Sequence, residues 1–448
     1  MPLKLSCNEL EILIEAAKRG DEYKPFQVAK RSIFEESGIA GTVLDRVFTA
    51  ILYRFFRARG VVEKIVSEAS ALSYVKTVQG AYLVRLYAFL RKLARIERDS
   101  VLEAIDRCLE DLAARWGEDL AALRRALDAV DAVELKPSSV EEELELRYFV
   151  PSYLVELLKP LLRDFSEIEA FLKAINEVPP LGFRVNTLKS DVDRVLRALR
   201  RAGVEAWVSE RVPNVVRYRG VLDYRRFRPL IRGEVVPQDE PSALAAKLLD
   251  PRPGDLILDM CAAPGGKTTH LAELSRNRAT IVALDLYPDR MARLLELAVR
   301  TSTYVSIYPA LCDARYAPSV LGEEKFDKVL LDPPCSSTGV LAKHPDARWR
   351  LSPDKILELV TLQRELLEAA NRVLKPGGLL LYTTCSVTVP ENEGNIRWFL
   401  HRHPCYEVIP LNGPYDPSPL LPGAMRSWPH RHGVSGFFFV LLVKRGRC

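Results

Sequence analysis

The chain has 448 residues, a formal net charge of +5 and 27% charged residues. This length suits about three domains, and so small a net charge is a weak indication of a nucleic-acid partner. No apolar run approaches the ~20 residues of a membrane span, and the N-terminus lacks the apolar core of a secretory signal. We therefore expect a cytoplasmic protein that has no membrane partner.

Eight cysteines are spread over this length without any CxxC spacing. The pattern favours neither a disulfide framework nor a zinc site, so we expect mostly reduced thiols and no bound metal. Most of these cysteines are interpreted as buried, unreactive side chains, as is usual for a free cysteine. This group comprises Cys7, Cys108, Cys312, Cys405 and Cys448.

Residues 1–135 carry a helical pattern throughout. From Thr42 to Arg59 the apolar residues recur at helical spacing, and Gly60 is expected to end that helix. Exposed basic residues such as Arg54 and Arg91 either bind RNA or are simply solvated, and the sequence favours neither. Further helices of this small bundle are expected at residues 81–96, 100–116 and 120–130.

A proline, two serines and an acidic run follow at residues 136–145, which suits a linker, the N-terminus of a helix, or both. Residues 147–235 then mix strand and helix patterns, which predicts a small α+β platform with a basic helix. Its expected elements are strands at 183–188, 206–209 and 215–218 and a helix at 190–202 that ends at Gly203.

The platform ends in a segment, Tyr224–Arg232, that interleaves basic residues with aromatic ones. Arginine neutralises phosphate and aromatic rings stack on bases, so this mixture suits single-stranded nucleic acid. A charged loop with two core aromatics is the alternative. We favour RNA contact here and assign it to Arg184, Asn186, Arg225, Arg226 and Arg228.

Strand and helix patterns alternate in the last region, residues 236–448. This alternation predicts an α/β fold with a doubly wound, Rossmann-like sheet, and the final strand, which no helix follows, predicts an antiparallel end. Strands are expected at 256–259, 280–285, 305–311, 328–331, 378–384 and 436–444, with helices that begin at Lys267, Pro288 and Ser352.

A glycine turn and three acidic strand ends indicate the cofactor. The turn, Gly265-Gly266-Lys267-Thr268, is no phosphate-binding loop, because Cys261 stands where that motif needs glycine. An acidic residue about twenty positions beyond such a turn accepts hydrogen bonds from ribose hydroxyls. The cationic sulfonium and amino groups of S-adenosylmethionine suit acidic strand ends. Those ends are Asp285, Asp313 and Asp332.

Two cysteines follow buried strands at the edge where open α/β sheets build their ligand sites. Cys335 ends the run Lys328–Cys335, and Cys385 lies in the run Leu379–Ser386. Two thiols that face a cofactor of this kind suggest covalent catalysis on a base.

These motifs together resemble those of the Sun/Fmu (RsmB/Nop2/NSUN) family of RNA cytosine-5 methyltransferases. The resemblance covers roughly Tyr148 to the C-terminus, and the helical region before it is more weakly similar to a NusB-like domain. The motifs are Asp259–His270, Asp332–Gly339, Thr384-Cys385-Ser386 with Glu391-Asn-Glu393, Gln238–Ser242, Arg184–Lys189, and Pro429-His430 with Gly436-Phe437-Phe438.

The resemblance implies a role for each matched position. Cys385 would be the nucleophile, Cys335 would assist product release, and Asp332 would lie near both the target base and the methionine end of the cofactor. A protonated Asp332 near N3 would stabilise charge on the ring. Further cofactor contacts are assigned to Cys261, Ala262, Ala263, Pro264, Gly265, Gly266, Lys267, Asp285, Arg290 and Asp313.

The expected activity is therefore S-adenosylmethionine-dependent methylation of cytosine C5 in RNA through a covalent cysteine–C6 adduct. Ribosomal RNA is favoured as the substrate, and tRNA is the rival. The alternatives are a non-catalytic RNA-binding assembly factor that kept the fold, and a DNA or protein methyltransferase. We expect a monomer that requires no protein partner.

Overall fold

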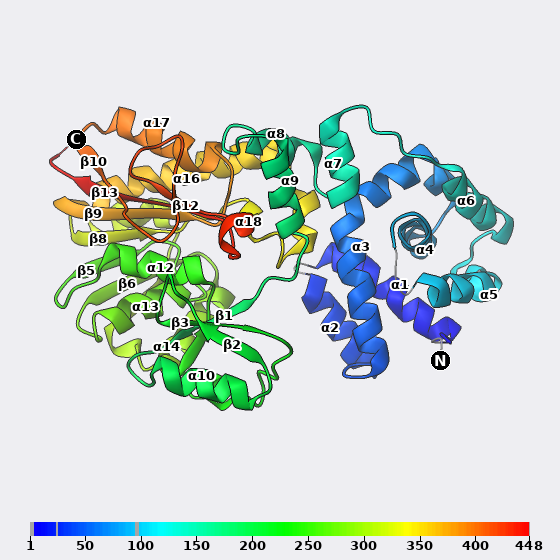
Figure 1. Cartoon of the computed structure of the whole chain (residues 1–448), viewed down its shortest axis with the longest axis horizontal. Helices are drawn as coiled ribbons and strands as arrows, with labels where there is room; N and C mark the ends of the chain where they lie inside the picture. The colour runs from blue at the N-terminus through cyan, green and yellow to red at the C-terminus, as the bar shows by residue number, and fades with distance from the viewer. Residues whose placement is uncertain (1–3, 24–25, 95–97, 448) are drawn as a thin grey trace. The chain divides into compact units, whose positions relative to one another are not determined.

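The computed structural model describes residues 4–23, 26–94 and 98–447, which fall into two compact units (Figure 1). The first comprises Met1–Glu156 with His344–Leu351, and the second comprises Leu157–Lys343 with Ser352–Cys448. The chain therefore enters the first unit twice. No helix in the described part of the chain has the length and apolar character needed to cross a bilayer.

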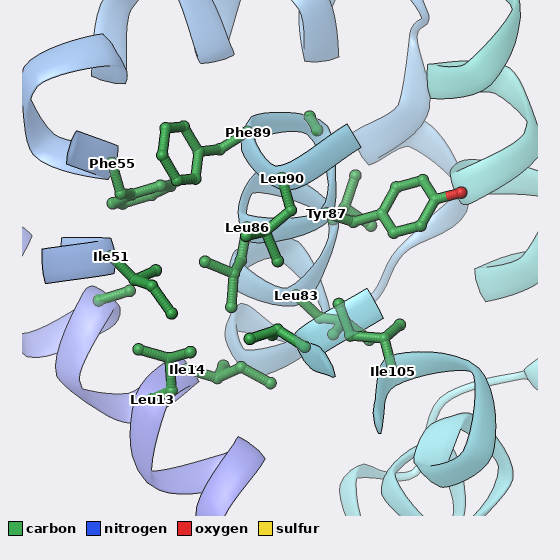
Figure 2. Close-up of a cluster of buried hydrophobic side chains, with 14 of the residues drawn as sticks. Leu13, Ile14, Ile51, Phe55, Leu83, Leu86, Tyr87, Phe89, Leu90 and Ile105 are labelled. Atoms are coloured by element: carbon green, nitrogen blue, oxygen red, sulfur yellow. The ribbon is translucent and has the colours of Figure 1, made fainter. Parts of the chain in front are cut away.

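The first unit contains only helices among its described residues. Figure 2 shows its core, in which Leu13 and Ile14 of the first helix meet Ile51, Phe55 and Leu86 of later ones. The elements are α1 (Cys7–Glu22), α2 (Phe26–Glu36), α3 (Val43–Glu68), η1 (Ala71–Tyr74), α4 (Val78–Ala88), η2 (Phe89–Leu93), α5 (Arg98–Trp116), α6 (Leu120–Ala132), α7 (Val140–Tyr148), most of α8 (Ser152–Leu158) and η6 (Pro345–Arg350).

Helix α3 does not end at Gly60, as the sequence suggested, but runs on to Glu68. The glycine serves close packing instead. A Cβ atom at position 60 would lie 2.0 Å from the indole ring of Trp349, and the Nε1 atom of that indole donates to the carbonyl of Arg57 at 2.7 Å. The missing side chain leaves room for a residue that arrives from far along the chain.

The expectation of reduced, inert cysteines is wrong for three of the five. Cys7 of α1 and Cys108 of α5 form a disulfide with Cα atoms 5.5 Å apart, and Cys405 is also disulfide-bonded. Sequence spacing does not reveal such a pair, because the packing of α1 against α5 joins positions 101 residues apart. Cys312 is a free thiol, and Cys448 lies outside the described residues.

Residues 136–145 contain both of the features considered for them. Residues 133–138 have no helix or strand, and α7 begins directly after Ser139, whose hydroxyl accepts a hydrogen bond from the backbone of Glu142 at 3.1 Å. The acidic run fills the first turn of that helix, where negative charge is stabilising.

The platform is a four-stranded antiparallel sheet in the order β2-β3-β1-β4. The strand expected at 183–188 is shorter at its C-terminal end, because the Asn186 side chain accepts from the backbone of Leu188 and turns the chain. The strands are β1 (Leu181–Val185), β2 (Glu205–Val208), β3 (Val215–Arg219) and β4 (Val235–Pro237), with helices α9 (Phe165–Ala174), α10 (Val192–Arg201) and α11 (Arg228–Ile231).

The large sheet has the strand order β11-β12-β13-β9-β8-β5-β6-β7, with β10 paired to β13. Strands β7, β6, β5, β8 and β9 are parallel, and β13 pairs antiparallel to β9. The strands are β5 (Leu256–Asp259), β6 (Thr280–Asp285), β7 (Ile307–Leu311), β8 (Phe326–Leu331), β9 (Leu374–Thr384), β10 (Tyr406–Ile409), β11 (Asp416–Pro417), β12 (Met425–Ser427) and β13 (Phe437–Lys444).

Helices cover both faces of this sheet, which confirms the predicted Rossmann-like α/β fold. Adjacent residues of β5 pack into different cores, Ile257 with α12, α13 and α14, and Leu258 with α16 and α17. The helices are α12 (Glu240–Leu249), α13 (Gly266–Leu274), α14 (Pro288–Thr301), α15 (Ala317–Leu321), α16 (Pro353–Val373), α17 (Asn395–Arg402) and α18 (Pro429–His432), with short η3 (Tyr304–Ser306), η4 (Ala314–Tyr316), η5 (Thr338–Val340) and η7 (Pro390–Gly394).

Candidate active site

A cleft of about 400 Å³ lies at the carboxyl ends of the parallel strands, where this class of sheet places its ligands. It contains acidic groups from three successive strand ends, both candidate catalytic cysteines and an apolar wall. Its lining comprises Met260, Cys261, Ala263, Asp285, Leu286, Tyr287, Arg290, Cys312, Asp313, Ala314, Arg315, Asp332, Pro333, Pro334, Cys335, Ser337, Leu362, Leu366 and Cys385.

The glycine turn forms one end of this cleft. Gly265 has φ +101°, which favours glycine, and a Cβ there would meet Leu294 at 3.0 Å. Of the turn residues, only Cys261 and Ala263 line the cleft; Ala262, Pro264, Gly265 and Gly266 complete the turn. Burial raises the pKa of the Cys261 thiol well above its usual range, which disfavours the reactive thiolate form.

Three carboxylates line the cleft as the sequence predicted. Asp285 accepts from the backbone of Ala263 at 3.1 Å and lies 3.4 Å from Arg290. Hydrogen bonds from Arg315 lower the pKa of Asp313 despite its partial burial. An acidic cleft with apolar walls fits a cationic nucleoside cofactor, so these residues suit S-adenosylmethionine.

The third carboxylate, Asp332, forms an ion pair of 2.5 Å with the buried Lys267. Burial acts to lower the pKa of Lys267, but the charge of Asp332 and its hydrogen bond raise it overall, so Lys267 is cationic. The role expected of Asp332 near N3 of the base stays a prediction. The fixed positive charge at this end of the cleft belongs to Lys267.

The two cysteine thiols lie together, with their sulfur atoms 3.2 Å apart. A hydrogen bond from Cys335 lowers the pKa of Cys385, although burial acts to raise it. The hydrogen bond with Ser337 and the charge of Lys267 also lower this pKa. The same hydrogen bond, together with burial, raises the pKa of Cys335. The pair therefore favours a Cys385 thiolate that accepts a hydrogen bond from a Cys335 thiol.

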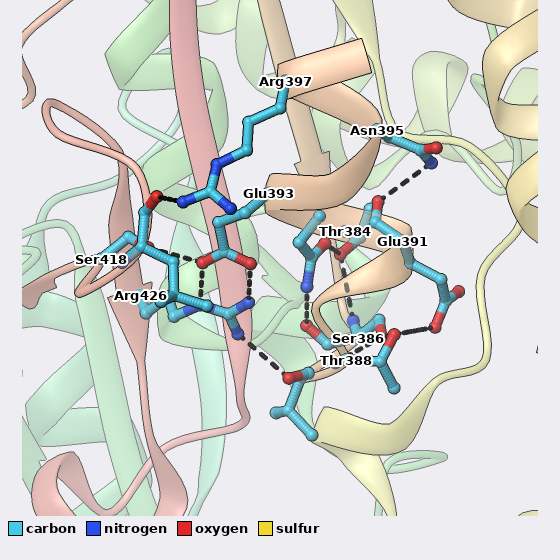
Figure 3. Close-up of polar contacts among 12 residues, drawn as sticks. Thr384, Ser386, Thr388, Glu391, Glu393, Asn395, Arg397, Ser418 and Arg426 are labelled. Carbon is cyan, nitrogen blue, oxygen red and sulfur yellow. Dashed lines mark hydrogen bonds and ion pairs between the residues drawn. The ribbon is translucent and has the colours of Figure 1, made fainter. Parts of the chain in front are cut away.

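A buried carboxylate joins the loops that carry these two cysteines, and Figure 3 shows how it lies beside Ser386 and Thr388, which follow Cys385. Glu391 accepts hydrogen bonds from the backbone of Ser336, at 2.7 Å, and from the hydroxyls of Ser386 and Thr388, at 2.6 and 2.7 Å. Ser336 follows one cysteine directly and Ser386 follows the other. The motif Glu391-Asn-Glu393 was recognised in the sequence, but this positioning role was missed, because it appears only when the loops meet.

The next acidic residue of that motif has a structural role. Glu393 forms a buried ion pair with Arg426, whose Nε donates at 2.7 Å and whose Nη1 donates to the Val387 carbonyl at 3.2 Å (Figure 3). Both side chains are at most 1% exposed. Strand β12 is thereby fixed to the chain that follows Cys385.

The assignment of Arg184 and Asn186 to RNA binding is wrong. Both are buried, and both are engaged inside the protein. Arg184 donates to Gln238 and Thr269 and pairs with Glu273, while the Asn186 amide donates to two backbone carbonyls. Their motif joins the platform to α13 and does not form a nucleic-acid surface.

The other three predicted RNA contacts, Arg225, Arg226 and Arg228, are exposed. Phe227 between them belongs to the platform core, where its ring stacks on Phe183. Phe227 is therefore a core aromatic residue, as the alternative interpretation of the Tyr224–Arg232 segment expected. RNA contact by the three arginines stays a prediction.

Comparisons with known proteins agree with this geometry. The model for the 16S rRNA methyltransferase RsmB/F family matches residues 246–443, and that for the ferredoxin-like domain of RsmF/B-like methyltransferases matches residues 150–223. Two relatives are each named ribosomal RNA small subunit methyltransferase B. The one from Klebsiella pneumoniae is 35% identical over 304 residues, 68% of either chain. The one from Cronobacter sakazakii is 37% identical over 280 residues, 62% of this chain and 63% of the relative.

A solved structure extends the likeness to the whole chain. The crystal structure of PH0851 covers 99% of this chain and is itself covered completely, with a TM-score of 0.85 and 39% identity. The weaker NusB-like resemblance of the helical region stays a prediction. The chain belongs to the RsmB/F family of 16S rRNA methyltransferases, and S-adenosylmethionine is its cofactor.

Proposed function

We propose that this protein methylates C5 of a cytosine in RNA and that Cys385 forms a transient bond to C6 of the base. The observation that carries the proposal is the cysteine pair, with sulfur atoms 3.2 Å apart at the end of the cofactor cleft. Two adjacent thiols suit addition to a pyrimidine carbon, whereas methylation of an amine needs neither.

The chemistry requires such a pair because C5 of cytosine is a poor nucleophile. Attack of the Cys385 thiolate on C6 breaks the C5–C6 π bond and places its electron pair on C5, which becomes nucleophilic. The cofactor supplies the electrophilic methyl group. Cys385 is suited to the attack because the Cys335 thiol and the Lys267 cation favour its ionised form.

Product release requires loss of the C5 proton. A base takes that proton, the C5–H electron pair re-forms the C5–C6 double bond, and the sulfur of Cys385 leaves as thiolate. Cys335, or a water that it orients, is our candidate for this step. The hydrogen bond to Cys385 raises the pKa of Cys335 and so favours its protonated form. Once the sulfur of Cys385 is bonded to C6, that interaction is lost, so Cys335 releases its proton to solvent more readily and its thiolate can then take the C5 proton.

The substrate class follows from the same site. A base must leave its stack to meet two thiols in a cleft, so the enzyme takes unpaired RNA or turns a nucleotide out. The names of the relatives favour ribosomal RNA of the small subunit, and tRNA remains the rival. Such a substrate agrees with the expected cytoplasmic location, and we retain the expectation of a monomer.

Trapping the adduct tests this proposal. The Cys335→Ala variant is incubated with S-adenosylmethionine and small-subunit rRNA transcribed in vitro, and protein–RNA species that survive denaturation are sought. We expect an adduct that disappears in the Cys335→Ala, Cys385→Ala double variant.

The controls separate the possible failures. If wild type forms 5-methylcytosine but the single variant traps nothing, the two cysteine roles are wrong. If wild type transfers no methyl group to this RNA, to tRNA or to assembled small subunits, the protein is a non-catalytic assembly factor and not an enzyme.

A further inference from the structure

A second cleft, of about 180 Å³, opens beside the loop that holds Cys385, and it shares no lining residue with the cofactor cleft. It is built by the platform, the end of α9 and the chain after it, the chain around η5, and the segment around α18. Its lining comprises Ala174, Glu177, Val178, Pro179, Pro180, Trp207, Arg217, Arg219, Gly339, Ala342, Pro429, Gly433, Val434 and Ser435.

Bare backbone separates this second cleft from the nucleophile. Gly339 lines the cleft, and its N–H donates to the carbonyl of Cys385 at 2.8 Å. Gly436 in turn donates to the Gly339 carbonyl at 2.9 Å. A Cβ atom on Gly339 would lie 2.0 Å from the Gly436 oxygen, so only glycine permits this thin connection between the second cleft and the Cys385 loop.

Trp207 gives the second cleft its chemical character. Two guanidinium groups lie over its ring in cation–π contacts, that of Arg217 at 5.7 Å and that of Arg219 at 5.8 Å from the ring centroid. Arg217 is nearly buried and donates to the Gly433 carbonyl, so it is fixed in place. Arg219 is exposed. A half-buried indole beside a fixed and an exposed cation presents stacking area and positive charge together.

We propose that this cleft binds the base of an unpaired nucleotide that flanks the target cytosine, an inference that rests on the proposed function. Trp207 stacks on the base and Arg219 neutralises its phosphate, the combination that holds single-stranded nucleic acid. The volume lies below the range of about 300 to 1,000 Å³ for drug-sized ligands, so it suits one base. The exposed carboxylate of Glu177 at the rim can accept from a base N–H.

The position explains why such a site is useful. A target base leaves its stack only at a cost, and a neighbour held on Trp207 retains part of the lost stacking energy. A base one step along the strand from the target lies where Gly339 joins the two sites. The cleft thereby aligns the strand as well as binding it.

The test is RNA binding by the full chain without cofactor, so it does not depend on turnover. The probe is a fluorescein-labelled 20-nucleotide oligocytidylate, followed by anisotropy at several salt concentrations. We expect Trp207→Ala to weaken binding about 10- to 100-fold, from the typical contribution of one stacked base. Trp207→Phe should stay within about threefold. Arg219→Ala should weaken binding and reduce the salt slope by about one.

Tyr308→Ala, at an exposed ring of edge strand β7 outside both clefts, is the matched control and should change nothing. For each variant, cofactor binding measured by calorimetry and the thermal unfolding midpoint show whether the protein is folded. If Trp207→Ala does not fold, the RNA affinity of Arg219→Ala alone tests the proposal. Wild-type affinity in both variants overturns the proposal even if the enzyme makes 5-methylcytosine. Weakened binding with no 5-methylcytosine from wild type would instead refute the proposed function and keep the cleft as an RNA site.

Discussion

At the scale of single residues, the cofactor cleft is an arrangement of charges around two sulfur atoms. The Cys335 thiol and the Lys267 cation favour a Cys385 thiolate, while burial and Asp332 oppose it. In the proposed mechanism, catalysis at neutral pH therefore depends on the balance between these effects. Removing one cation should shift that balance measurably.

The Lys267→Met variant tests this balance. Losing the cation and leaving Asp332 unpaired should raise the pKa of Cys385, so the thiolate forms at higher pH. The rise of kcat/KM with pH should therefore move to higher pH, and kcat/KM at pH 7 should be lower than that of wild type. The measurements are the pH–rate profile and the pH dependence of iodoacetamide labelling at Cys385, followed by mass spectrometry.

The control is Lys375→Met, which removes a half-buried lysine paired with Asp327. Its profile should match that of wild type. An unshifted profile for Lys267→Met would show that Lys267 does not assist the thiolate.

At the scale of elements, buried polar contacts position the loops between strands. The pair of Glu393 and Arg426 is buried and ties β12 to the chain after Cys385. Replacing one partner leaves an uncompensated charge in a buried site, so Arg426→Met should cost about 3–5 kcal/mol of unfolding free energy. Urea denaturation measures this change.

The exposed pair of Arg372 and Glu323 provides the comparison, since both side chains are more than half exposed. Arg372→Met should cost at most about 1 kcal/mol. Equal losses in the two variants would refute the special role of the buried pair.

The sequence predicted those elements that local patterns determine. Strand β5, the acidic end of β6 and both cysteines after β8 and β9 follow from apolar runs that end in polar residues, and their meeting at one edge follows from parallel pairing. The role of Arg184 in RNA binding and that of Gly60 as a helix end were mispredicted, because each residue has a partner far away in the chain, Glu273 for Arg184 and Trp349 for Gly60.

Other features had no local signal at all. The second cleft depends on Trp207, Gly339 and Gly433, which three distant segments bring together. Each looks ordinary in its own stretch of sequence: an aromatic residue in a strand, and glycines in loops. Only tertiary packing brings these three residues together in one cleft.

At the scale of the whole molecule, the helical unit is held by a covalent link as well as by its core. The disulfide of Cys7 and Cys108 encloses a loop with a sequence separation of 101 residues. Closing a loop of this length restricts the unfolded chain, with a typical effect of about 2–4 kcal/mol. Cys7→Ser should therefore lower the thermal unfolding midpoint of the helical unit.

Cys312→Ser, which removes a free thiol, is the matched control in the same calorimetric scan. If both variants unfold with wild-type midpoints, the link does not contribute to stability. Added reductant should lower the midpoint of wild type but leave that of Cys7→Ser less affected.

The discontinuity of the helical unit also bears on how the protein is made. Its helices up to α7 leave the ribosome first, yet the segment His344–Leu351 that belongs with them comes much later. Until then, Gly60 faces no indole, and the carbonyls of Tyr148 and Phe149 lack the buried guanidinium of Arg348. Domains usually fold in the order of their synthesis. Here the helical unit precedes the methyltransferase sheet in the chain, yet it is completed only after the strands β5 to β8 of that sheet have been translated.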